Sequence, residues 1–159
     1  MKNIGLLFMV GLLIISCNHT PKQNADSNPE KESAIDSVSE TITDGVFIHI
    51  TESHNDPHRV LMPLKMAVMM ATDKDVLVYM DIHAVELLVK GAKDLNFANF
   101  ESAQTYIRQL IDKKIGVYVC PTCLKAAGFK QEDLLDGVQL AQKDKFFNFT
   151  KGRIITLDY

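Results

Sequence analysis

The sequence is poor in cysteine, in unbalanced charge and in long apolar runs. Its 159 residues include three cysteines, Cys17, Cys120 and Cys123. Basic side chains number 17 and acidic ones 20, for a net charge of −3, so no positive surface suited to nucleic acid is expected. The longest apolar run, Ile4–Ile15, is too short to span a bilayer comfortably. No internal repeat is visible. These absences argue against a nucleic-acid partner and a repeat architecture.

The first residues have the pattern of a signal peptide. Lys2 is a basic start, and the run to Ile15 has the length of a signal-peptide apolar region. The segment Ile14-Ile15-Ser16-Cys17 resembles the lipobox of bacterial lipoproteins, in which the cysteine becomes the lipidated first residue. We therefore expect a signal peptide over residues 1–16 and a lipid anchor on Cys17. This places the protein in the bacterial cell envelope, facing the periplasm or the exterior. An ordinary secretory signal with a chance cysteine is the alternative.

The segment after Cys17 differs in composition from the rest of the chain. Residues 18–43 contain almost no large apolar side chains and are rich in Ser, Asn, Glu and Lys. Such a segment cannot bury enough surface to offset the entropy lost on ordering. We interpret residues 17–43 as the lipidated cysteine followed by a disordered tether. Residues 44–159 are long enough for one domain with its own core.

Segments of strand type and of helix type alternate over this domain. Strands are expected at residues 45–51, 75–82, 115–119, 138–141 and 154–159, and helices at 58–72, 83–92, 98–114, 121–128 and 143–151. Such alternation is typical of a parallel sheet covered by helices on both faces. The sequence therefore predicts an α/β fold, a flavodoxin-like three-layer α/β/α arrangement with a mainly parallel five-stranded sheet.

The sequence predicts where the first helix begins and which face of the third helix is apolar. Asp56-Pro57 suits an N-cap and first helical residue, although Pro63 would then lie inside the helix, and a start near Pro63 is the alternative. The segment 98–114 places Phe100, Ala103, Ile107, Leu110 and Ile111 on one face of an amphipathic helix.

Three segments that carry polar or thiol side chains follow expected strands. They are residues 52–59, Asp81–His83 and Cys120–Cys123. In parallel sheets the ligand sites lie at the carboxyl ends of the strands, where the strand order reverses. His83 therefore shares an edge with Cys120, and we predict that it polarises or deprotonates a thiol. His49, in the middle of a strand, is expected to be a core histidine held by a hydrogen bond.

Cys120 and Cys123 are candidates for thiol chemistry. A structural zinc site needs about four ligands, and the other soft ligands, His54 and His58, lie on a different loop, so we expect no metal. Pro121 suits the first turn of a helix, which makes Cys120 a candidate N-cap whose thiolate would accept free backbone N–H groups. Cys123, one turn along, would then be the resolving thiol. An inert buried pair or a structural disulfide is the alternative.

The region around these cysteines resembles the DsrE/DsrF-like (YchN-like) family. The likeness lies in an apolar strand, C-x-x-C followed by Leu-Lys-Ala, then Gly-Phe, acidic residues and Asp136-Gly137-Val138, and it extends over residues 45–159. The resemblance implies a compact α/β fold with a mainly parallel sheet, often assembled into trimers or hexamers. It also implies sulfane sulfur carried as a persulfide on Cys120, which matches the family's cysteine at the end of the third strand.

Together these features predict a membrane-anchored sulfur-transfer or thiol-redox protein without a cofactor. Cys120 would accept a persulfide or sulfenic acid, and Cys123 would resolve it. The expected partners are the membrane, through the lipid on Cys17, further copies of the chain in a trimer or hexamer, and an unidentified sulfur donor or acceptor. The alternative is a non-catalytic tethered oligomer that binds a small ligand or a partner protein.

Overall fold

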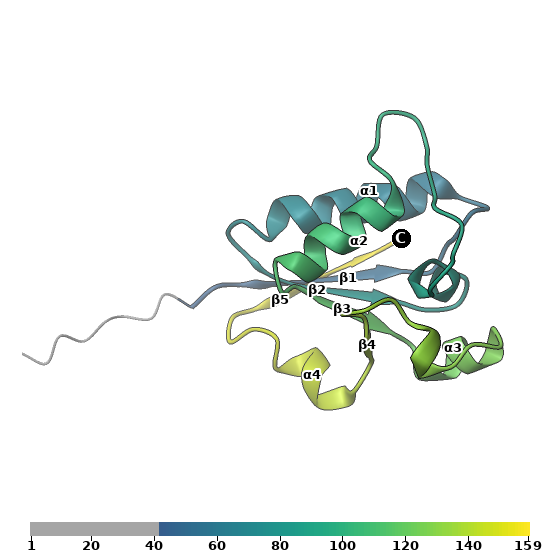
Figure 1. The fold of residues 1–159 in the computed structure, drawn as a ribbon. Helices are drawn as coiled ribbons and strands as arrows, with labels where there is room; N and C mark the ends of the chain where they lie inside the picture. The colour runs from purple at the N-terminus through teal and green to yellow at the C-terminus, as the bar shows by residue number, and fades with distance from the viewer. Residues whose placement is uncertain (1–41) are drawn as a thin grey trace, which may run out of the picture. The chain divides into compact units, whose positions relative to one another are not determined.

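Strands and helices alternate along residues 42–159, the part of the chain that the computed structural model describes (Figure 1). The predicted signal peptide, the lipid anchor on Cys17 and the tether as far as residue 41 lie outside the described residues. Within residues 42–159, no helix combines the length and the apolar character needed to cross a membrane.

The elements follow the predicted alternation. In chain order they are β1 (Gly45–Ile50), α1 (Pro57–Met70), β2 (Asp75–Met80), the 3-10 helix η1 (Ala84–Leu88), α2 (Ala103–Asp112), β3 (Gly116–Val119), α3 (Pro121–Ala126), the 3-10 helix η2 (Gln131–Asp133), β4 (Gln139–Leu140), α4 (Lys143–Phe147) and β5 (Ile154–Asp158).

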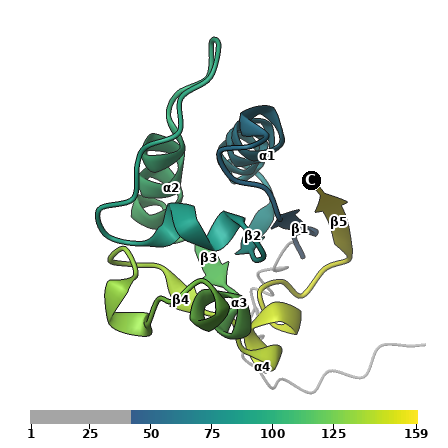
Figure 2. The ribbon, with the colours of Figure 1, turned by 90° about the vertical axis from the view of Figure 1, so that its right-hand side faces the viewer.

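The five strands form one sheet in the order β4-β3-β2-β1-β5, and every pairing is parallel. Helices α1 and α2 lie side by side over one face, whereas α3 and α4 lie on the other (Figure 2). The predicted three-layer α/β/α fold with a five-stranded sheet is therefore confirmed. The strand order reverses between β1 and β5, so the cysteines that follow β3 lie at the predicted edge but two strands away from the reversal.

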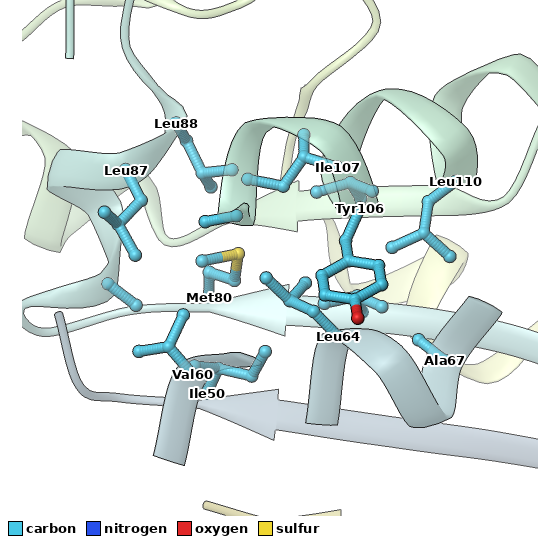
Figure 3. Close-up of a cluster of buried hydrophobic side chains, with 14 of the residues drawn as sticks. Ile50, Val60, Leu64, Ala67, Met80, Leu87, Leu88, Tyr106, Ile107 and Leu110 are labelled. Carbon is cyan, nitrogen blue, oxygen red and sulfur yellow. The ribbon is translucent and has the colours of Figure 1, made fainter. Parts of the chain in front are cut away.

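The main core lies between the sheet and the helices α1 and α2. Alternate residues of β1, Val46, Ile48 and Ile50, point to this side, as do Val76, Val78 and Met80 of β2, because successive strand residues face opposite sides of a sheet. Figure 3 shows the buried side chains that meet them, which come from α1, η1 and α2: Val60, Leu64, Ala67, Leu87, Leu88, Tyr106, Ile107 and Leu110.

The first helix begins at Pro57, which decides between the two predicted starts. Asp56 is the N-cap, and its carboxylate accepts a hydrogen bond from the Arg59 backbone N–H at 3.3 Å. Proline at the first helical position costs nothing, because that N–H has no helical partner. The helix then runs through Pro63, whose ring is buried.

The amphipathic helix α2 is shorter than the predicted segment. It begins at Ala103 because Ser102 caps it, accepting a hydrogen bond from the Thr105 backbone N–H at 3.2 Å. Phe100 therefore lies before the helix, and the prediction that it belongs to the helical face is wrong. Tyr106 takes its place among the buried residues of the face.

The second face of the sheet carries aromatic side chains. Phe47 of β1, Tyr79 of β2 and Tyr118 of β3 point to this side, and the ring of Phe146 from α4 packs edge-on against all three, with centroid distances of 5.7, 5.0 and 6.0 Å. Edge-to-face packing is the arrangement that the aromatic quadrupole favours. Tyr79 is thereby held in place near the end of β2.

Candidate functional site

The loops after β1, β2 and β3 meet at the carboxyl edge of the sheet. Hydrogen bonds join them there: the backbone N–H of Cys120 donates to Met80, that of Asp81 to Ile50 and that of His83 to Thr51, at 3.1, 3.2 and 3.1 Å. The edge thus brings together the segments that follow the three central strands, as the sequence predicts.

Cys120 is the N-cap of α3, as predicted. Its backbone is extended, and its Sγ accepts a hydrogen bond from the Cys123 backbone N–H at 3.3 Å. Pro121 occupies the first helical position, and the Cys120 carbonyl accepts the first helical hydrogen bond from Leu124 at 2.9 Å. The sulfur therefore takes the place that a serine or aspartate oxygen takes at other helix starts.

The surroundings of Cys120 favour its thiolate. Burial alone raises the pKa of the Cys120 thiol, but hydrogen bonds from the Cys123 backbone N–H, the Tyr79 hydroxyl, the Cys123 thiol and the Thr122 backbone N–H outweigh it and lower that pKa. Hydrogen bonds that donors make to the charged form stabilise that form. At neutral pH this raises the fraction of the more nucleophilic species.

Cys123 has the opposite character. Burial raises the pKa of its thiol, and so does its role as donor to Cys120, while the backbone N–H of Ile82 opposes these effects by donating to Cys123. The charges of Cys120 and Asp81 disfavour a second anion beside them. Both cysteines are free and half-buried. The pair therefore combines an activated thiol with a neighbour that keeps its proton.

Tyr79 is a functional candidate that sequence reasoning missed. Its hydroxyl donates to Cys120, and burial together with that hydrogen bond raises the pKa of the Tyr79 phenol well above the ordinary value. The phenol thus remains a donor throughout the physiological range. The only signal in the sequence is the alternation of β2, which places Tyr79 on the face opposite Val78 and Met80.

His49 lies beside this group in the next strand. It pairs in register with Tyr79, and the two rings stack with centroids 5.3 Å apart. Its Nε2 lies 2.9 Å from Asp81 Oδ1, and its Nδ1 lies 3.0 Å from Asp158 Oδ1. The predicted hydrogen bond is present, but His49 is on the second face of the sheet with 25 % of its side chain exposed, so its placement in the core is wrong.

The backbone at Ile82 is strained. Its φ of 48° lies in the left-handed region, which β-branched residues rarely adopt. This conformation turns the chain sharply after β2, exposes the Ile82 side chain and directs its N–H to Cys123. Strain of this kind persists only where the surrounding structure imposes it, and it occurs preferentially at functional sites.

His83 is near Cys123 rather than in contact with Cys120. It is the residue before η1 and lines a depression of about 380 Å³ with Cys123, Ala126 and Ala127. Within residues 42–159 no hydrogen bond joins the His83 ring to either thiol. From this position His83 would face a molecule in the depression, and its catalytic role stays a prediction.

The two histidines weighed as metal ligands lie in different surroundings. His54 lines a second depression, whereas His58 packs against the rings of Phe97 and Phe100, with centroids 5.9 and 5.5 Å away. Among the described residues, no group of three or more His, Cys, Asp or Glu side chains is placed to hold a metal ion.

Comparison with known families agrees with the geometry of this edge. Residues 44–156 match the sequence profile of the DsrE/DsrF-like family, which covers most of the chain. The chain belongs to the DsrE/DsrF-like family. This is a family implicated in sulfur transfer, and the predicted resemblance is confirmed. No curated protein matches the chain.

Two solved structures share the fold of this DsrE/DsrF-like chain. The crystal structure of the ychN protein from E. coli superposes with a TM-score of 0.58 at 18 % identity, covering 72 % of this chain and 99 % of that one. The protein of unknown function MTH1491 from Methanobacterium thermoautotrophicum gives a TM-score of 0.51 at 20 % identity, covering 71 % and 98 %. At such identities the likeness concerns the fold alone.

Proposed function

We propose that this DsrE/DsrF-like protein carries sulfane sulfur on Cys120 and that Cys123 resolves the loaded form. The observation that carries the proposal is the place of Cys120 at the start of α3, where its Sγ accepts a hydrogen bond from the Cys123 backbone N–H at 3.3 Å. The pKa of the Cys120 thiol is lowered there while that of the Cys123 thiol is raised. Cys120 is suited to act as the nucleophile, and Cys123 is suited to remain protonated until it resolves the loaded form.

The chemistry is a pair of displacements at sulfur. The Cys120 thiolate attacks the terminal sulfur of a polysulfide, a new S–S bond forms, and the shortened polysulfide leaves as an anion. Cys120 then holds a persulfide. When Cys123 loses its proton it can attack the inner sulfur, which forms the Cys120–Cys123 disulfide and releases hydrosulfide. The donors around Cys120 also stabilise the negative charge of a persulfide or sulfenate there.

Sulfur loading tests the proposal. The reduced full-length chain is exposed to inorganic polysulfide, and intact mass with peptide mapping follows the added sulfur. Wild type and Cys123→Ser should gain sulfur on the Cys120 peptide, and Cys123→Ser should hold it longer because the resolving thiol is gone. Cys120→Ser should gain none on that peptide. Equal loading of Cys120→Ser and wild type would contradict the proposal and favour the non-catalytic binding module.

The proposal includes attachment to the bacterial cell envelope and assembly into a trimer or hexamer. The lipobox-like sequence before Cys17 supports the first part. Exposed apolar side chains support the second, because a monomer would leave them in water. They include Met62 and Met69 of α1, Phe147 of α4 and Ile155 of the edge strand β5, which are 39, 61, 67 and 56 % exposed.

A further inference from the structure

Two depressions adjoin at the carboxyl edge and form what is here named the edge groove. The first, of about 380 Å³, reaches Cys123. The second, of about 420 Å³, extends toward the loop after β1. His83 and Glu86 line both, so the two volumes share a wall. Each volume is within the usual range of small-ligand sites.

The two ends of the edge groove differ in chemistry. Around Cys123 the lining is apolar, with Ile82, Ala126 and Ala127. At the far end the lining residues carry polar groups, with Ser53, His54 and Asn55 beside the shared His83 and Glu86. A molecule that fits both ends has sulfur and methylene groups at one end and hydrogen-bonding groups at the other.

Ser53 supplies an unpaired polar group at the far end. Its residue is 3 % exposed, and its Oγ has no hydrogen-bond partner within the described residues. Its backbone, by contrast, is fixed, because the Ser53 N–H donates to Asn55 Oδ1 at 3.3 Å and the Ser53 carbonyl accepts from the Asp56 N–H at 3.3 Å. Buried hydroxyls nearly always have a partner, and the Ser53 hydroxyl has none among the described residues, so it is left as a donor and acceptor at this end of the groove.

The charged and polar side chains of the edge groove indicate which groups a bound molecule would carry. Glu86 is exposed and makes no ion pair within residues 42–159, so its carboxylate is available to an ammonium. The Ser53 hydroxyl and the rings of His54 and His83 can donate to a carboxylate. An amino acid carries an ammonium and a carboxylate on the same α-carbon. Its two charged groups therefore match this arrangement.

We propose that the edge groove binds an amino-acid persulfide, a small amino acid with an S–SH group beside its α-ammonium and α-carboxylate groups, as the sulfur donor. This inference rests on the function proposed above. Cys123 lines the apolar end of the groove and its thiol donates to Cys120, so a sulfane sulfur at that end lies beside the residue that contacts Cys120. The Cys120 thiolate attacks the outer sulfur of the donor, the donor's S–S bond breaks, and the amino-acid thiolate leaves and takes a proton from water.

The test compares three donors on the reduced full-length chain: cysteine persulfide, its desamino analogue without the ammonium group, and inorganic polysulfide. Rates of sulfur transfer to Cys120 are followed by quenched intact mass. Glu86→Gln should slow cysteine persulfide about tenfold, the factor lost with one charge-assisted hydrogen bond, and leave the other two donors within about twofold. Glu132→Gln, which removes an exposed carboxylate outside the groove, should leave all three rates unchanged.

Ser53→Ala provides a second variant that keeps the fold. It should slow both carboxylate-bearing donors about fivefold and spare polysulfide, while the thermal midpoint stays at or above that of wild type because an unpartnered buried hydroxyl is removed. If wild type accepts sulfur from polysulfide but Glu86→Gln and Ser53→Ala change no donor selectively, the edge-groove proposal is wrong and the function on Cys120 stands. If no donor loads Cys120 in wild type, both are wrong.

Discussion

The hydroxyl of Tyr79 should tune the reactivity of Cys120, and Tyr79→Phe removes it without changing the ring. The ring itself is fixed by His49 on one side and Phe146 on another, so the variant should keep its packing. Hydrogen bonds to charged groups contribute roughly 1.5–3 kcal/mol, and sulfur is a weak acceptor, so the lower end applies. Because about 1.4 kcal/mol is a factor of ten, the thiolate fraction below the pKa should fall about tenfold.

Two effects of this variant oppose each other. A more basic thiolate is a better nucleophile, and with a Brønsted coefficient of about 0.45 a tenfold change in basicity raises the limiting rate about threefold. At pH values below the thiol pKa, the tenfold lower thiolate fraction outweighs the threefold higher reactivity of each thiolate. The rate there should therefore fall about threefold. At high pH it should rise about threefold. The pH profiles of Tyr79→Phe and the parent should cross.

The assay is the reaction of Cys120 with an aromatic disulfide reagent over a range of pH, with Cys123→Ser as the parent. Tyr118→Phe is the matched control, because Tyr118 pairs in register with Tyr79 and also packs against Phe146 but belongs to the next strand. Its profile should coincide with that of the parent. Profiles for Tyr79→Phe and Tyr118→Phe that change alike would refute the reasoning, because a general loosening of the aromatic face would then explain both.

Three further predictions follow from the core, the N-terminus and the surface. Leu64→Ala, at a fully buried position between α1 and the sheet, should lower the free energy of unfolding by about 2–5 kcal/mol, measured by chemical denaturation. Lys65→Ala, at the exposed neighbouring position, is the control and should lower it by under ~1 kcal/mol. Cys17→Ala should abolish partitioning into the membrane fraction, and retention of normal processing and membrane binding would contradict lipid anchoring. The full-length chain in mild detergent should sediment as a trimer or hexamer, and a clean monomer at micromolar concentration would contradict the assembly.

The fold could be predicted because its signals are local. The β-branched runs at the three central strands and the helical patterns between them specify a parallel sheet, and Asp56-Pro57 and Ser102 mark helix starts through their own side chains. The N-cap position of Cys120 could also be predicted, because the end of a strand followed by Pro121 is visible in the sequence. The apolar pattern predicts Phe100 on the helical face, but the N-cap at Ser102 follows it, so Phe100 lies outside the helix.

The contacts that give the site its character could not be predicted in the same way. Tyr79 reaches Cys120 only through the pairing of β2 with β3, a register that no local pattern encodes. His83 follows the left-handed backbone of Ile82, a conformation that the isoleucine side chain itself disfavours and that the sequence therefore does not predict. Ser53 and Glu86 come together only when the loop after β1 and the 3-10 helix η1 meet at the edge.

The most direct test of the central claim is the pH dependence of thiol reactivity in the two single-thiol forms of the full-length chain. The reaction rate follows the thiolate fraction, so a lowered pKa moves the midpoint of the profile to lower pH and a raised pKa moves it to higher pH. Cys120 in Cys123→Ser should reach its half-maximal rate at a lower pH than an ordinary cysteine, and Cys123 in Cys120→Ser at a higher one, as the converging donors at one sulfur and burial at the other require. Coinciding midpoints, or the reverse order, would contradict the assignment of Cys120 as the reactive thiol.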